Sequence, residues 1–121
     1  MRIDPNPKYH GMPCSFVATG TAYEQIYNTP FEKELPDGLK DDGYLSLNDI
    51  NKFVRDNLKV RKKEYYKRGT RITLKEFLEN NLERCLVCVY GHFIYVDKKK
   101  YWSFFNNEND LIVCVWYLKG E

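Results

Sequence analysis

The segment RCLVCVYGHFIYVDKKKYWSFFNNENDLIVCVWYL, residues 84–118, decides the fold of this chain. It consists of short apolar runs of Val, Ile, Tyr, Phe and Trp, which are separated by polar stretches at 97–100 and 106–110. Runs of this kind between polar turns are typical of antiparallel strands. We therefore predict four strands, at residues 86–89, 93–96, 101–105 and 111–118.

The N-terminal part of the chain predicts an extended arm and then helix. Residues 1–12 are polar and contain two prolines and a glycine, which indicates an extended arm. Pro13 suits the first position of a helix, and we expect Gly20 to interrupt that helix and a second short piece to follow at 22–27. An acidic loop is expected over 31–45.

Two further helices are indicated by capping patterns. Ser46 and Thr73 each stand three residues before an acidic residue and just before an apolar repeat of helical spacing, which predicts helices over 47–57 and 74–81. The basic stretch between them, residues 59–68, is a candidate short strand. Helices that precede the main group of strands indicate an α+β domain.

The length and composition of the chain limit the classes of protein to which it can belong. A chain of 121 residues with 43% hydrophobic and 30% charged residues suits a single globular domain, residues 1–121. Its longest apolar run is far shorter than the roughly 18 residues of a membrane span, so no membrane is expected. Four cysteines without a secretory signal predict reduced thiols in the cytoplasm.

The sequence also suggests a nucleic-acid-binding surface and a zinc site, and each has a simpler explanation. The basic residues between 59 and 75, with Tyr65 and Tyr66 among them, resemble a nucleic-acid-binding surface. A net charge of +2 favours a solvated basic face instead, so nucleic acid is not the expected partner. Cys85 and Cys88 have a spacing found in zinc sites, but residues three apart on a strand face opposite sides. No metal and no cofactor are therefore expected.

The pair that predicts chemistry is Cys14 and His92. A thiol at the start of a helix has its pKa lowered by the free N–H groups there, so we expect Cys14 to be partly exposed and to react first with iodoacetamide. A sheet-borne imidazole at His92 could take the thiol proton, with Asn106 or Asn107 to orient it. The alternative is that Cys14 is a core thiol and His92 a buried polar residue.

Several segments together resemble small papain-like cysteine peptidase domains of phages and bacteria. Residues 18–27 are similar to the first-helix segment of that family, and 71–78 to its middle helix. Residues 87–97, with Gly91-His92, resemble the strand that carries the catalytic histidine, and 101–104 and 115–117 resemble the last two strands. The resemblance implies a papain-like fold with N-terminal helices packed on a C-terminal antiparallel sheet.

The same resemblance matches some of the candidate site residues directly and others only with a shift. An ungapped match places His10 at the nucleophile position, and Cys14 follows about one helical turn later. The acidic position after the histidine strand falls on Trp102, which leaves Asn106 as the candidate for orienting His92.

The resemblance therefore implies a cysteine hydrolase that acts on an amide or related acyl bond, with Cys14, His92 and Asn106 as the catalytic residues and a peptide or protein as substrate. The alternative is a catalytically inactive papain-like domain that binds or inhibits a protein, for example a phage protein that acts on a host factor.

Overall fold

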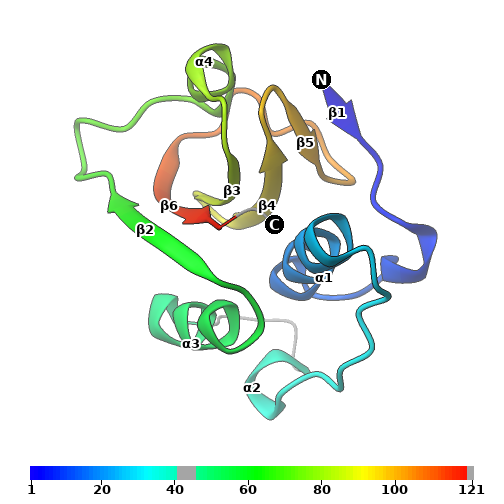
Figure 1. Ribbon diagram of the computed structural model, residues 1–121. Helices are drawn as coiled ribbons and strands as arrows, with labels where there is room; N and C mark the ends of the chain where they lie inside the picture. The colour runs from blue at the N-terminus through cyan, green and yellow to red at the C-terminus, as the bar shows by residue number, and fades with distance from the viewer. Residues whose placement is uncertain (41–45, 120–121) are drawn as a thin grey trace.

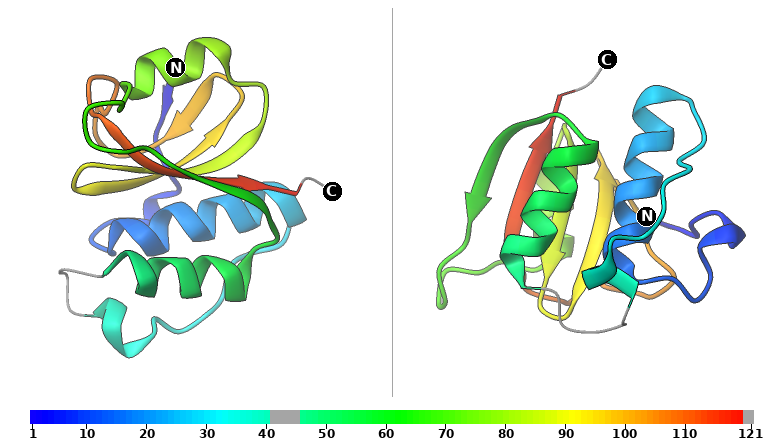
Figure 2. Two further views of the ribbon diagram at one scale, coloured as in Figure 1. Left: turned by 90° about the vertical axis from the view of Figure 1, so that its left-hand side faces the viewer. Right: turned by 90° about the horizontal axis from the view of Figure 1, so that it is seen from below.

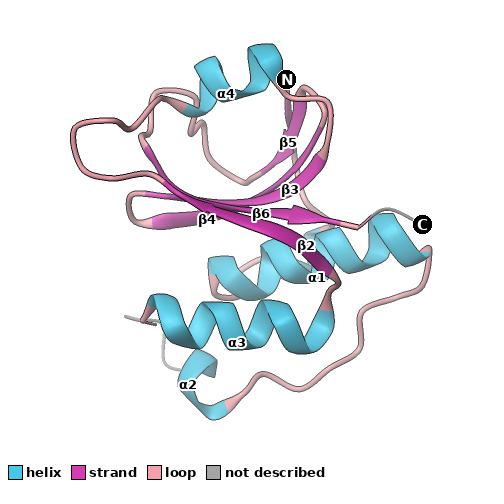
Figure 3. Cartoon of the chain, turned by 60° about the vertical axis from the view of Figure 1, so that its left-hand side comes forward, coloured by secondary structure: helices cyan, strands magenta, loops and turns pink. Residues whose placement is uncertain are grey.

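A computed structural model describes residues 1–40 and 46–119 of the chain. A single six-stranded sheet forms the middle layer, with strand order β1-β5-β4-β3-β6-β2. Helices α1 and α3 cover one face of this sheet and α4 covers the other (Figures 1 and 3). The α+β class predicted from the sequence is confirmed. No helix in the described part of the chain is long and apolar enough to cross a membrane.

The sheet is mixed rather than purely antiparallel. Its strands are β1 (Arg2–Ile3), β2 (Val60–Tyr65), β3 (Arg84–Val89), β4 (His92–Asp97), β5 (Lys100–Trp102) and β6 (Ile112–Leu118). All neighbours pair antiparallel except β1 and β5, which run parallel. The predicted strands β3 to β6 are present, whereas β1 was missed because two residues are too short to show a period.

Helix α1 (Cys14–Tyr27) is one continuous helix, so the predicted interruption at Gly20 is wrong. A Cβ atom at this position would lie 2.4 Å from the Tyr9 hydroxyl oxygen and 2.9 Å from the Phe31 ring. Glycine is therefore required here by close packing rather than by a break in the helix. The packing also corrects the view of residues 1–12 as a simple arm, because Tyr9 ends a short 3-10 helix (Pro7–Tyr9) and is buried.

The capping patterns predicted the next helices closely. Helix α3 (Leu47–Asn57) begins after Ser46, whose hydroxyl accepts the Asp49 N–H, and α4 (Leu74–Asn80) begins after Thr73 in the same way. These side chains bind N–H groups that the first helical turn leaves free. A four-residue helix α2 (Asp37–Lys40) lies within the predicted acidic loop, of which residues 41–45 lie outside the described residues.

Alternate residues of the central strands build two cores. On the α1 and α3 face, Phe93 and Tyr95 of β4 pack with Leu86 of β3, and on the α4 face Ile94 and Val96 pack with Val87. The same alternation sends Cys88 to the first face and Cys85 to the second, as the sequence predicted. Within the described residues, no group of three or more His, Cys, Asp or Glu side chains is placed to hold a metal ion.

The edge strand β2 carries much of the basic run. Lys63 lies over the Trp116 ring of β6, and Lys62 lies over Tyr117 next to it. Arg61 forms an ion pair with Glu83. These cations are therefore engaged with neighbouring rings and with an acid of the same chain.

The fold brings the N-terminal ends of two helices and one turn between strands together at one end of the molecule. The N-terminal ends of α1 and α3 lie at the same end as the turn between β3 and β4 (Figure 2). His92 begins β4 immediately after that turn, and Cys14 begins α1. Because chain ends of this kind expose unpaired backbone groups and reachable side chains, this end is where a site is expected.

Candidate active site

Cys14 is the first residue of α1 and is half-buried. The predicted lowering of its thiol pKa is wrong: burial raises the pKa, although backbone N–H groups of Phe93, Ser15 and Cys14 itself lower it in part. Removal of the thiolate from water therefore outweighs the hydrogen bonds that a helix N-terminus offers. The thiol is protonated at neutral pH until a base removes its proton.

His92 is the first residue of β4 and pairs with Val89 across the turn. Gly91 occupies the position before it with a φ of 83°, a conformation that favours glycine. The imidazole is half-buried and meets the Phe105 ring edge to face at 5.6 Å. Burial lowers the pKa of His92, and the negative charge of Asp110 opposes this shift. The ring is therefore neutral at neutral pH and free to act as a base.

A chain of hydrogen bonds runs from the imidazole to a carboxylate. Ser103 Oγ lies 3.4 Å from His92 Nε2 and donates to Asn107 Oδ1 at 2.6 Å. Asn107 Nδ2 in turn donates to Asp110 Oδ2 at 2.7 Å. Ser103 and Asn107 are buried, with exposed fractions of 3% and 6%. The loop after β5 thus holds three polar side chains in a fixed order behind His92.

This chain determines the tautomer of the imidazole. The Asp110 carboxylate can only accept, so Asn107 must turn its NH₂ group towards it and its oxygen towards Ser103. The Ser103 proton is then committed to Asn107, and its oxygen can only accept from His92. The proton on the neutral ring therefore lies on Nε2, and Nδ1 carries the lone pair that can accept a proton.

Asn106 does not take the place that the sequence analysis gave it. Its Oδ1 accepts from the Tyr101 hydroxyl at 3.4 Å and from the Glu108 N–H at 3.0 Å, and its side chain is exposed. The polar side chain that lies within hydrogen-bond reach of the His92 ring is Ser103. The two other positions singled out by the resemblance lie elsewhere: His10 is exposed and stacks on Phe104, and Trp102 packs against Tyr95.

Cys14 and His92 line the same cavity, which has a volume of about 470 Å³. The backbone of Phe93, next to His92, also interacts with the Cys14 thiol. Helices, strand ends and the β3–β4 turn all contribute to the wall, and the lining residues are Pro13, Cys14, Ser15, Leu39, Leu47, Ile50, Tyr65, Cys88, Val89, Gly91, His92, Phe93 and Val113. The structure thus places the predicted thiol and imidazole in the wall of one cavity.

The remaining cysteines are poorer nucleophiles. Cys85 and Cys114 are fully buried, and burial raises the pKa of both thiols, that of Cys114 to about 11. Cys88 is half-buried in the wall of the same cavity as Cys14, and burial raises its pKa to about 12. Of the four thiols, only Cys14 stands at a helix N-terminus.

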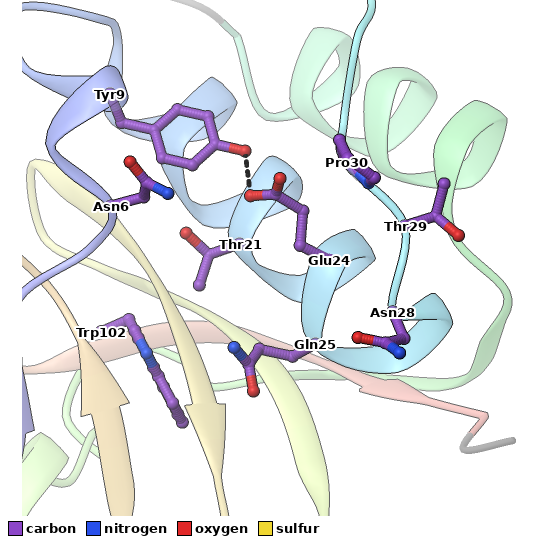
Figure 4. Close-up of a pocket in the computed structure, with 9 residues that line it drawn as sticks. All are labelled: Asn6, Tyr9, Thr21, Glu24, Gln25, Asn28, Thr29, Pro30 and Trp102. Atoms are coloured by element: carbon purple, nitrogen blue, oxygen red, sulfur yellow. Dashed lines mark hydrogen bonds between the residues drawn. The ribbon is translucent and has the colours of Figure 1, made fainter.

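A second pocket, of about 340 Å³, lies along the C-terminal half of α1 (Figure 4). Its walls are largely polar, and the Glu24 carboxylate among them already has three hydrogen-bond partners. The Glu24 carboxylate accepts from the Tyr9 hydroxyl at 2.7 Å, from Lys8 Nζ at 2.6 Å and from the Phe31 N–H at 3.1 Å. This network ties the N-terminal segment and the chain after α1 to the helix, which is a structural role.

Sequence reasoning missed Ser103 and Asp110 in the candidate site. Ser103 directly follows the position where the resemblance places an acidic residue, so an offset of one residue would have found it. Asn107 was named as an alternative orienting residue, and it does belong to the chain, one bond further from the ring. Comparison with family models, with curated proteins and with solved structures finds no match to this chain.

Proposed function

We propose that this chain is a cysteine hydrolase with a papain-like arrangement, which breaks an amide or related acyl bond. One observation carries the proposal: Cys14, at a helix N-terminus, and His92, in a defined tautomer, line one cavity. A chain of hydrogen bonds that ends in a carboxylate orients His92, and this corresponds to the arrangement of a nucleophile, a base and an orienting group in known cysteine hydrolases.

The pKa shifts define how the nucleophile is activated. Because burial raises the pKa of Cys14 and lowers that of His92, both groups are neutral at rest. The proton therefore moves from sulfur to His92 Nδ1 as the sulfur attacks the carbonyl carbon. The Nε2–H that faces Ser103 stays in place, and the charge of Asp110 stabilises the imidazolium that forms.

The backbone at the start of α1 supports the negative charge of the intermediate. The N–H groups of Phe16 and Val17 both bind the Pro13 carbonyl, whereas those of Cys14 and Ser15 precede the first helical hydrogen bonds. Two such N–H groups can stabilise an oxyanion. When the tetrahedral intermediate collapses, the imidazolium gives its proton to the leaving group. Water then adds to the thioester, with His92 again as the base, and releases the acid.

The test is formation of an acyl-enzyme on Cys14. With p-nitrophenyl acetate, intact-mass analysis should show one acetyl group, and peptide mapping should place it on residue 14. Cys14→Ala should abolish the adduct and nitrophenol release. His92→Ala should lower the rate by about 10²–10⁴-fold, the usual contribution of a general base. The matched control is His10→Ala, which removes an exposed imidazole outside the cavity. Equal rates in the two histidine variants would contradict the proposal.

A binding module is the second candidate, and a surface feature favours it. Exposed large apolar side chains gather next to residues that line the cavity: Met12 precedes Pro13, Tyr90 precedes Gly91, and Tyr65 lines the cavity itself. Phe105, 62% exposed, contacts His92. Clusters of exposed apolar residues commonly mark binding surfaces. This candidate is preferred if no ester acylates Cys14 and if His92→Ala changes only the stability of the fold.

A further inference from the structure

We infer that the substrate of this site carries an aliphatic acyl group, and that the cavity beside Cys14 binds this group during the reaction. The inference rests on the hydrolase function proposed above and adds the class of substrate. It follows from the lining of the cavity, from the position of the base and from the size of the space.

The part of the cavity wall outside the catalytic pair is mostly apolar, and Ser15 and Tyr65 are the hydroxyl-bearing residues in it. Leu39 from α2, Leu47 and Ile50 from α3, and Val113 from β6 all contribute to it. Among the described residues that line the cavity, none carries a carboxylate, an ammonium or a guanidinium group. A charged substrate side chain would lose its water there without finding a partner, whereas an alkyl chain would be stabilised by leaving water.

The chemistry determines which half of the substrate faces this wall. His92 must give a proton to the leaving group, so the leaving group lies beside the imidazole on the sheet. The acyl group is then directed away from His92, and we expect it to contact the apolar lining that includes Leu47 and Ile50. The acyl group also stays attached to Cys14 until the thioester is hydrolysed, so its contacts with these side chains act in both steps.

The size of the cavity excludes the smallest acyl groups as good substrates. Its volume of about 470 Å³ lies in the usual range of about 300–1,000 Å³ for small-molecule sites. An acetyl group would leave most of this volume empty. A chain of several carbons can reach Leu47 and Ile50 and bury its methylene groups against them.

A series of p-nitrophenyl esters from acetyl to octanoyl tests the inference on the intact chain. Each buried methylene is worth about 0.8 kcal/mol, and 1.36 kcal/mol is a factor of ten. We therefore expect kcat/KM to rise about fourfold for each added methylene until the cavity is full. Each rate is divided by the rate of the same ester with free cysteine, which removes differences in intrinsic reactivity.

Variants of the apolar wall link the trend to the cavity. Leu47→Asn should flatten the dependence on chain length, so that the octanoyl ester loses more rate than the acetyl ester. The matched control is Leu82→Asn, because Leu82 is 77% exposed and does not line this cavity. Ile50→Val removes a single methylene and should lower the octanoyl-to-acetyl ratio by up to about fourfold. This mild change gives a reading even if Leu47→Asn fails to fold.

The outcomes separate the two proposals. If Cys14 is acylated but the rate does not depend on chain length, the acyl-chain inference is overturned and the hydrolase function stands. If the rate rises with chain length equally in Leu47→Asn and in the parent chain, the preference does not come from this cavity and the inference is again overturned. If no ester acylates Cys14, the hydrolase function itself fails and the inference fails with it.

Discussion

Replacement of Ser103 by alanine tests the hydrogen-bond chain behind His92 more directly than any other change. The Ser103 hydroxyl makes three contacts: it donates to Asn107 Oδ1 at 2.6 Å, accepts the Phe105 N–H at 3.1 Å and lies 3.4 Å from His92 Nε2. Alanine removes all three contacts and leaves the Asn107 oxygen buried without its donor.

The expected loss of stability follows from these contacts. The two shorter bonds contribute about 1 kcal/mol each, and the buried acceptor left without a donor adds to this, so we expect a loss of about 2–3 kcal/mol. With an unfolding entropy of about 2.1 cal/mol/K per residue, the melting temperature of this 121-residue chain should fall by about 8–12 °C.

Ser15→Ala is the matched control for stability. Ser15 is 2% exposed, nearly the same as the 3% of Ser103, but its hydroxyl has no hydrogen-bond partner among the described residues. Its removal should change the free energy of unfolding by less than about 0.5 kcal/mol or raise it slightly.

Urea denaturation of both variants measures the difference, with the slope m checked for constancy. In Ser103→Ala the imidazole also loses the acceptor that holds its proton on Nε2. The small fraction of unfolded variant would lower the measured rate of acyl transfer only slightly, and we expect a larger decrease than that. Equal stability losses in the two serine variants would refute the assigned chain, and an unchanged rate in Ser103→Ala would refute its role in orienting His92.

Other predictions concern pH, thiol reactivity and packing. Because burial lowers the pKa of His92 from 6.5, kcat/KM should rise with pH along a limb centred below 6.5 and then stay level through neutral pH. A decline at alkaline pH would indicate a preformed ion pair instead. The part of the free energy of unfolding that depends on the charge state of His92 is fully present above pH 6.5 and is lost as the pH falls through the lowered pKa. Urea titrations at several pH values can measure this loss. Asp110→Asn removes the charge that raises this pKa, so the acid limb measured by ester hydrolysis should move to lower pH. Mass mapping after iodoacetamide treatment should find Cys14 alkylated before the other thiols, at a rate that keeps rising above neutral pH because its thiol is mostly protonated. Gly20→Ala should destabilise the fold by about 1–3 kcal/mol in thermal melts, because the new methyl group overlaps the Tyr9 hydroxyl; an unchanged melting temperature would contradict this packing.

The sequence predicted the elements whose signals are local. Ser46 and Thr73 bind the first turns of α3 and α4 within three residues of themselves, so their capping patterns suffice to place both helices. The β3–β4 hairpin is equally local, because continuous apolar runs at 86–89 and 93–96 stand on either side of Gly91. Gly20 misled the prediction because glycine is a helix breaker on average, while the packing of Tyr9 and Phe31 that requires it here is not visible in a local window.

The candidate site was only half predictable for the same reason. Cys14 and His92 were chosen by residue type and by place within an element, and the structure places both at one cavity. Ser103 was missed because its role depends on the register of β4 and β5, which pairs Tyr95 with Trp102 and brings the next residue near the His92 ring. The two-residue turn between Asp97 and Lys100 sets this register, but the sequence does not show that the chain after β5 carries Ser103 towards the His92 ring.

The parallel pairing of β1 with β5 has a consequence for the order in which the candidate site assembles. The Ser103 N–H donates to the Ile3 carbonyl at 3.1 Å, and Arg2 donates to the Ser103 carbonyl at 3.1 Å, so the start of the chain holds the residue that orients His92. During synthesis the Cys14 helix leaves the ribosome long before either His92 or Ser103 exists. Contacts so distant along the chain form slowly and late. We therefore expect the proposed nucleophile to remain without its proposed base until the pairing of β1 with β5 completes the sheet.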